Sequence, residues 1–396
     1  MLTILTLLLT FSAAFCWQTQ PGAQAQMWLY VLISVLTGAM IYRKQREFGR
    51  LTFWFVPALL IIVMAVSGSR AAPPHRWGEA PGTVWGYQLY WLAQDAATAR
   101  YLAVAWFATI YVLISLCYTS RRAAKELVLA GVVIYAVTII QVIAGIDPRS
   151  MILQQPSYAA TLCALLLPVS AVLEKQRRDC YVLGGIVAVL LYRAETGYAL
   201  MVIYLAFWAM ERRGIKLEYR YYLPALFGIG AVVGILAMFF TPTTALDRIM
   251  FWRGAISDFL AHPILGVGPG RFYHYGLGHH WPGYFAHSLP LTFLSEVGII
   301  GMLVLALFVA MVWGTRRKRP AYANQVLLMA AVASLWDDAW LMWAISLVIA
   351  VALATTLPDE DTVPEFTEVL IRTQSAQSYY TNKAKNLIWR LITCKL

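Results

Sequence analysis

Charged residues are scarce in this sequence: Asp, Glu, Lys and Arg make up 13% of its 396 residues, against about 25% in a soluble globular domain. Hydrophobic residues make up 60%, where roughly 45–50% is usual. So apolar a composition excludes intrinsic disorder, a collagen-like chain and a pair of soluble domains. It predicts an all-α polytopic membrane protein.

Cysteine is also scarce, with five residues in the chain. None lies in a CxxC motif or near a histidine, so the sequence predicts neither a metal site nor a disulfide framework. The sequence implies no cofactor, and it has no fixed-period internal repeat.

Long hydrophobic runs are abundant, and a bilayer core of about 30 Å needs about 20 apolar residues per helix. Twelve spans are predicted, at residues 2–17, 27–42, 51–67, 102–119, 127–146, 158–173, 180–193, 197–210, 222–240, 288–313, 326–337 and 340–357. They form one transmembrane domain over residues 1–357. We expect its first helix to be retained rather than cleaved as a signal peptide. Residues 358–396 form a tail that ends in a basic amphipathic stretch suited to membrane lipids.

Lys and Arg predict the orientation of these spans, because cytoplasmic loops collect cations. Alternate links carry 18 of the 31 cations, the links between them carry 8, and the tail carries 5. Both termini are therefore expected in the cytoplasm. Two large loops, 68–101 and 241–287, are expected on the outer face, the second between helices 9 and 10. In a Gram-negative bacterium this face is the periplasm and the membrane is the inner membrane. Because the cations are explained by topology, the net charge of +11 is no argument for nucleic acid.

The outward-facing links contain arginine but no lysine, and all six histidines lie there. Guanidinium groups bind phosphate in a bidentate manner, which suits a diphosphate ligand. Selection against lysine during membrane insertion explains the same distribution equally well. His287, at the mouth of the tenth span, is a candidate general base. A structural or solvated histidine at that position is the competing interpretation.

Arginines near His287 in the sequence complete a constellation suited to a phosphate leaving group. Arg248, Arg253 and Arg271 lie on the same predicted side of the membrane as His287. They would neutralise a diphosphate while the histidine takes a proton from an acceptor hydroxyl. No ATP is available outside the cell, so an activated lipid-linked donor is the expected substrate class.

The segment GVGPG at 266–270 supplies Gly266 and Gly268 and predicts a tight turn rather than a dinucleotide site, because no strand precedes it. Its glycines would let the backbone approach a ligand closely or make the loop mobile. The aromatic residues that follow suit either a sugar-stacking platform or an interfacial aromatic belt.

Charges at membrane depth are costly and mark candidate functional sites. They fall in short outward turns or just inside a span, and together they predict a polar cavity that opens outward. The residues are Arg149, Arg193, Glu195, Glu296, Asp337 and Asp338. A local Arg193–Glu195 ion pair is the competing explanation for one of these turns.

Several of these motifs occur in the order found in a known superfamily. His287-Ser288, nine residues and then Gly298-x-x-Gly301 resembles a signature of O-antigen ligases. Upstream, the segment from Arg248 through Arg253 to HPILGVG at 262–268 is similar to a second conserved block of the O-antigen ligase and polymerase superfamily. A weaker likeness joins Arg149 to PSYA at 156–159. The resemblance covers roughly residues 147–313.

The resemblance implies a membrane glycosyltransferase fold of the GT-C type and metal-independent transfer of a glycan from undecaprenyl diphosphate. The acceptor hydroxyl would belong to lipid A–core, as in lipopolysaccharide biosynthesis. His287 would activate it, and Arg253 or Arg248 with Arg193 or Arg149 would hold the diphosphate. Ser157 and Met302 depart from the usual pattern, and the motif around Arg193 matches loosely.

Other functions remain open from the sequence. Within the superfamily these are polymerisation of O-antigen repeat units and transfer to a protein. A function of a different class is anion transport, in which the embedded arginine and acid pairs would line the path of the ion. The chain lacks the repeated halves of many transporters, and its charges gather near one face, so the enzyme is the favoured interpretation.

Overall fold

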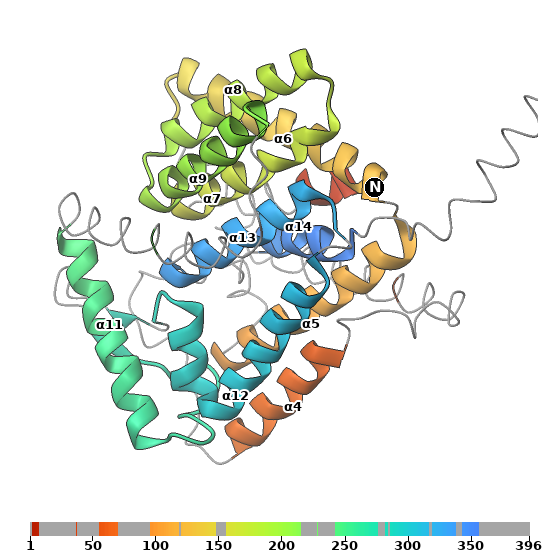
Figure 1. Ribbon diagram of the computed structural model, residues 1–396. Helices are drawn as coiled ribbons and strands as arrows, with labels where there is room; N and C mark the ends of the chain where they lie inside the picture. The colour runs from red at the N-terminus through yellow and green to blue at the C-terminus, as the bar shows by residue number, and fades with distance from the viewer. Residues whose placement is uncertain are drawn as a thin grey trace, which may run out of the picture. The chain divides into compact units, whose positions relative to one another are not determined.

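A computed structural model describes the chain at residues 2–7, 37, 55–69, 96–118, 120–147, 156–214, 228, 242–275, 282–283, 286–316, 319–337 and 343–355. The described part is almost entirely helical, which confirms the expected all-α class (Figure 1). The chain divides into two compact units, Met1–Thr355 and Thr356–Leu396. The transmembrane domain expected at residues 1–357 and the tail expected at 358–396 stay predictions.

The elements follow one another from the first described long helix to the last before the tail. They are α4 (Phe55–Ser69), α5 (Ala96–Cys117), α6 (Ser120–Ile143), α7 (Pro156–Leu166), the 3-10 helix η4 (Pro168–Val172), α8 (Lys175–Tyr192), α9 (Glu195–Arg212), α11 (Pro242–Ala261), the short strands β1 (His274–Tyr275) and β2 (Pro282–Gly283), α12 (Leu289–Gly314), α13 (Ala321–Trp336) and α14 (Trp343–Ala354). The two strands pair antiparallel.

Two described helices, at Arg121–Ile143 and Leu289–Gly314, are long and apolar enough to cross a membrane. Further apolar helices are shorter, among them α4, α13 and α14. The described helices overlap nine of the twelve predicted spans along most of their length. Most of the spans predicted at 2–17, 27–42 and 222–240, and the tail, lie outside the described residues. The count of twelve and the cytoplasmic termini stay predictions.

Helix α11 was not expected, because it occupies residues that the hydrophobic pattern assigned to the large loop 241–287. Its sequence mixes charged and apolar residues, so it lacks the continuous apolar run of a span. It packs along α12 and against β1. Phe251 and Ala255 of α11 form a small core with Phe272 and Ala286. This helix therefore belongs to the folded body and carries two of the predicted arginines.

The main core surrounds α7, in which every residue from Tyr158 to Leu166 is buried. Helices α6, α8, α9, α13 and α14 pack against it. A second core joins α4, α5 and α12 through apolar side chains that include Met64, Val104 and Phe293. Helix α5 contacts both α4 and α14. The cores bring the beginning of α12, the end of α13 and the beginning of α7 together.

Helix α12 is broken at Gly298, whose φ of 66° and ψ of −159° are not helical. The loop 262–268 pairs with the opened backbone. Val267 and Gly268 donate their N–H groups to the carbonyls of Ser295 and Glu296, at 2.8 and 3.0 Å. Beyond the break, the N–H groups of Ile299 and Ile300 donate to the carbonyls of Pro263 and Ile264. The break thus exchanges helical hydrogen bonds for bonds to the loop, as buried backbone groups require.

Glycine is needed on both sides of this contact. A Cβ on Gly298 would lie 2.5 Å from the carbonyl oxygen of Ile264, and a Cβ on Gly266 would lie 2.4 Å from that of Ser295. Both residues also have φ near +67°, a region that side chains disfavour. The close backbone approach expected of this loop is therefore made to α12. Gly301 is helical and packs on Val297.

Candidate functional site

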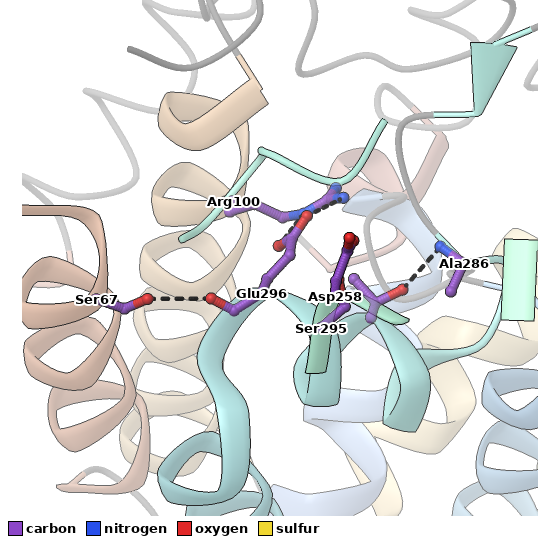
Figure 2. A network of polar contacts seen from close by, with 7 residues as sticks. Ser67, Arg100, Asp258, Ala286, Ser295 and Glu296 are labelled. Atoms are coloured by element: carbon purple, nitrogen blue, oxygen red, sulfur yellow. Dashed lines mark hydrogen bonds and ion pairs between the residues drawn. The ribbon is translucent and has the colours of Figure 1, made fainter. Parts of the chain in front are cut away.

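His287 lies immediately before α12 with φ of 51°, a left-handed conformation that is uncommon outside glycine and costs of order 1–3 kcal/mol. The flanking backbone is held on both sides. The N–H of Ala286 donates to Thr292 Oγ1 at 3.2 Å (Figure 2). The N–H of Thr292 donates to the Ser288 carbonyl at 2.8 Å. Ser288 is the buried N-cap residue of α12. The fold thus fixes the histidine in one orientation.

Asp337 supplies a carboxylate to this histidine. Its Oδ1 lies 3.4 Å from His287 Nδ1 and accepts a hydrogen bond from the Tyr158 hydroxyl at 3.1 Å. The Asp337 side chain is 4% exposed and that of His287 is 25% exposed. A carboxylate at Nδ1 favours the tautomer with the proton on Nδ1 and a lone pair on Nε2. This is the arrangement of a general base with its orienting acid.

A positive charge lies beside this pair. Arg248 of α11 acts electrostatically on Asp337, and its Nη1 lies 3.6 Å from Glu195 Oε2 at the start of α9. Phe251, one helical turn after Arg248, stacks on the His287 ring with centroids 5.6 Å apart. We call the group of His287, Asp337, Tyr158, Arg248 and Glu195 the His287 site.

The other predicted arginines occupy different places. Arg253 follows Arg248 by five residues, which turns it roughly 140° around α11, and it is exposed. Arg193 is the exposed, left-handed C-cap of α8. Arg271 donates to the Gly68 carbonyl at 3.5 Å, and burial lowers its pKa. Arg149 and Asp338 lie outside the described residues.

The suggested local ion pair between Arg193 and Glu195 is replaced by a longer-range one. The α8–α9 turn places Arg193 in a left-handed and Ala194 in an extended conformation. The carboxylate of Glu195 meets Arg248 instead. Within the described part of the chain, Arg193 makes no ion pair.

Glu296 belongs to a second polar group that sequence reasoning missed. Arg100 of α5 donates to both of its carboxylate oxygens, from Nε and from Nη2, each at 3.1 Å (Figure 2). The side chains are 5% and 3% exposed. Ser67 of α4 donates to the carbonyls of Glu296 and Leu265. We call Ser67, Arg100, Leu265 and Glu296 the Arg100–Glu296 cluster; it ties α4, α5 and the loop to the broken helix.

A third contact joins α11 to the same stretch of α12. Asp258 Oδ2 accepts a hydrogen bond from the Ser295 hydroxyl at 3.0 Å, and Figure 2 shows these two residues. The same oxygen lies 3.0 Å from His274 Nε2. His274 and His287 therefore have different carboxylate partners. The carboxylate partner of His287 is also acted on by Arg248, which pairs with Glu195.

No group of three or more His, Cys, Asp and Glu side chains in the described residues is placed to hold a metal ion. Metal-independent chemistry stays a prediction. The sequence matches no protein-family model, and a search of curated proteins finds no match. The site is therefore interpreted from its own geometry.

Proposed function

We propose that the protein is a membrane O-antigen ligase that transfers a glycan from undecaprenyl diphosphate to a hydroxyl of lipid A–core on the periplasmic face. The observation that carries this proposal is the contact between His287 Nδ1 and Asp337 Oδ1, with Arg248 beside it. A base oriented by a carboxylate next to a cation suits hydroxyl activation and a charged leaving group.

The proposed reaction is a single displacement at the anomeric carbon of the donor sugar. Nε2 of His287 takes the proton of the acceptor hydroxyl, and the acceptor oxygen forms a bond to that carbon. The bond between the carbon and the diphosphate oxygen breaks. Undecaprenyl diphosphate leaves with the electron pair, and His287 then loses its proton to water. Asp337 stabilises the transient imidazolium.

Arg248 and Arg193 are the proposed contacts of the diphosphate. They are linked through the α8–α9 turn, because Arg193 lies two residues before Glu195, the partner of Arg248. Two guanidinium groups at this place would balance the charge that develops on the leaving oxygen. Arg253 is a weaker candidate because it lies on another face of α11.

Reconstitution tests the proposal directly. Purified protein in proteoliposomes receives undecaprenyl-diphosphate-linked glycan and lipid A–core, and the product is followed by its mobility on a gel. We expect transfer by the wild type, in the presence of a metal chelator, and a loss of about 10²–10⁴-fold in His287→Ala. His262→Ala, an exposed histidine in the loop that pairs with α12, is the control. Full transfer by His287→Ala would show that His287 is not the general base.

Cell-based lipopolysaccharide banding separates the related reactions. A deletion strain that loses all O-antigen attachment supports a ligase. A strain that attaches single repeat units identifies a polymerase, and unchanged lipopolysaccharide with unmodified glycoproteins identifies transfer to protein. Uptake of a labelled anion by proteoliposomes without donor lipid would show that the protein is a transporter rather than a glycosyltransferase.

A further inference from the structure

An open cavity of about 530 Å³ lies at the beginning of α6, and none of its lining residues belongs to the His287 site. Its lining combines three cations, one acid and one leucine: Arg121, Arg122, Lys125, Glu126 and Leu129. All five belong to the first three turns of a helix that is long and apolar enough to cross a membrane. The cavity is open to the outside of the fold.

The only acid of this lining already has partners. Glu126 lies 3.5 Å from Arg122 Nε and accepts the N–H of Thr3 at 3.1 Å. The guanidinium of Arg122 also lies over the Tyr118 ring, at 5.6 Å from its centroid. The carboxylate of Glu126 is therefore already engaged by Arg122 and by the backbone of Thr3.

Arg121 and Lys125 make no ion pair within the described part of the chain. They lie four residues apart on one face of α6, where like charges repel. They also lie in the first two turns, at the positive end of the helix dipole, which disfavours cations. A bound anion would relieve both costs, so this end of the cavity has the electrostatics of an anion site.

An exposed apolar stripe continues from these two cations along the same face of the helix. At helical spacing it contains Leu129, Val132, Ala136, Ile140 and Ile143, all exposed. The distance from Arg121 to Ile143 is about 33 Å at 1.5 Å per residue, close to the bilayer core thickness. Cations at one end of a stripe of this length match a phosphate headgroup with its acyl chain.

We infer that the cavity binds an anionic phospholipid. Its phosphate lies between Arg121 and Lys125, and an acyl chain lies along Leu129 and Val132. The inference requires that α6 cross the membrane and does not depend on glycan transfer. The alternative is that Arg121 and Lys125 only set the membrane orientation, in which case they would bind no lipid selectively. Lys175 and Arg213 serve as the control cations for this alternative. Both are exposed cations at the same predicted membrane face, and neither lines this cavity.

Native mass spectrometry of the full chain in detergent tests the site, with phosphatidylglycerol as the probe. Phosphatidylcholine with the same acyl chains is the uncharged reference. We expect Arg121→Gln/Lys125→Gln to weaken phosphatidylglycerol binding about 25-fold, because each cation near an anionic surface contributes about fivefold. Lys175→Gln/Arg213→Gln should change binding less than twofold. Leu129→Asn should weaken it about fivefold through lost apolar contact.

Three results would overturn the inference. Equal binding of phosphatidylcholine would show that no charge is recognised. Equal loss in the two double variants would show a diffuse basic surface rather than this cavity. Displacement of the lipid by millimolar inorganic phosphate would show a site for a soluble anion. All substituted residues are exposed, and an unchanged unfolding temperature confirms that each variant folds.

Discussion

The Arg100–Glu296 cluster and the His287 site both place charges inside a largely apolar protein, yet their geometry differs. In the cluster, a guanidinium meets both oxygens of a carboxylate at 3.1 Å, and both side chains are almost fully buried. In the site, His287 is a quarter exposed and meets Asp337 at 3.4 Å. The first geometry is typical of a structural contact. The second, with a strained residue and an accessible ring, is typical of a group that reacts.

Separating the buried ion pair gives the largest expected effect. Arg100→Ala or Glu296→Ala leaves one charge without a partner, and we expect a loss of about 3–5 kcal/mol in the free energy of unfolding. Thermal unfolding in detergent measures it. The double variant Arg100→Met/Glu296→Leu should recover most of the loss, because apolar residues of similar volume replace such pairs well. No difference between the single and double variants would contradict a structural role.

Asp337→Asn is the corresponding change in the His287 site. The amide keeps the shape of the carboxylate but favours the wrong imidazole tautomer, so glycan transfer should fall about 10²–10⁴-fold. Thermal stability should change by less than about 1 kcal/mol, since the amide retains hydrogen bonds. The measurement pairs transfer with unfolding temperature in one preparation. A clearly lower unfolding temperature for Asp337→Asn would show that Asp337 has a structural role, like Glu296.

Gly298→Ala tests the helix break between the two regions. Its positive φ and the backbone contact with Ile264 predict a loss of about 1–3 kcal/mol or more. Gly314→Ala is the matched control, because a Cβ there meets nothing within 4 Å. Unfolding temperatures of the two variants should move differently, with the control at or slightly above the wild type. Equal values would mean that α12 tolerates a regular helix at 298.

An exposed ion pair gives the smallest effect. Arg178 donates to both oxygens of Glu211, at 2.9 and 2.6 Å, and this hydrogen bonding lowers the Glu211 pKa. Its stabilisation is complete at neutral pH and disappears as pH falls through the lowered pKa. Glu211→Gln should cost less than about 1 kcal/mol at pH 7 and nothing at a pH below that pKa. A cost as large as that of Glu296→Ala would contradict the distinction between buried and exposed pairs.

The sequence predicted continuous apolar helices well and polar ones poorly. The span expected at 288–313 agrees with α12 because almost all of its residues are apolar, with Glu296 as its one charge. Helix α11 escaped detection because charged residues interrupt its apolar face. The break at Gly298 was visible only as part of a GxxG motif. The loop residues that pair with the break lie 28 or 36 positions away in the sequence, and the hydrophobic pattern carries no signal for such a pairing.

The site was predicted as a set of residue types and not as a set of contacts. His287, Arg248 and Asp337 were each candidates, but nothing in the sequence paired His287 with an acid 50 residues later. Arg100 and Glu296 are 196 residues apart, so their pairing also needed the structure. A buried arginine opposite an embedded glutamate is the signal that sequence reasoning could have used, since isolated charges are costly at depth.

Glycan transfer and unfolding temperature, measured together for His287→Ala and Arg100→Ala, test the central claim most directly. His287→Ala should keep the unfolding temperature of the wild type and lose at least about 100-fold in transfer. Arg100→Ala should unfold earlier and, where folded, retain transfer. If His287→Ala transfers glycan at the wild-type rate, the assignment of His287 as the reacting base is wrong.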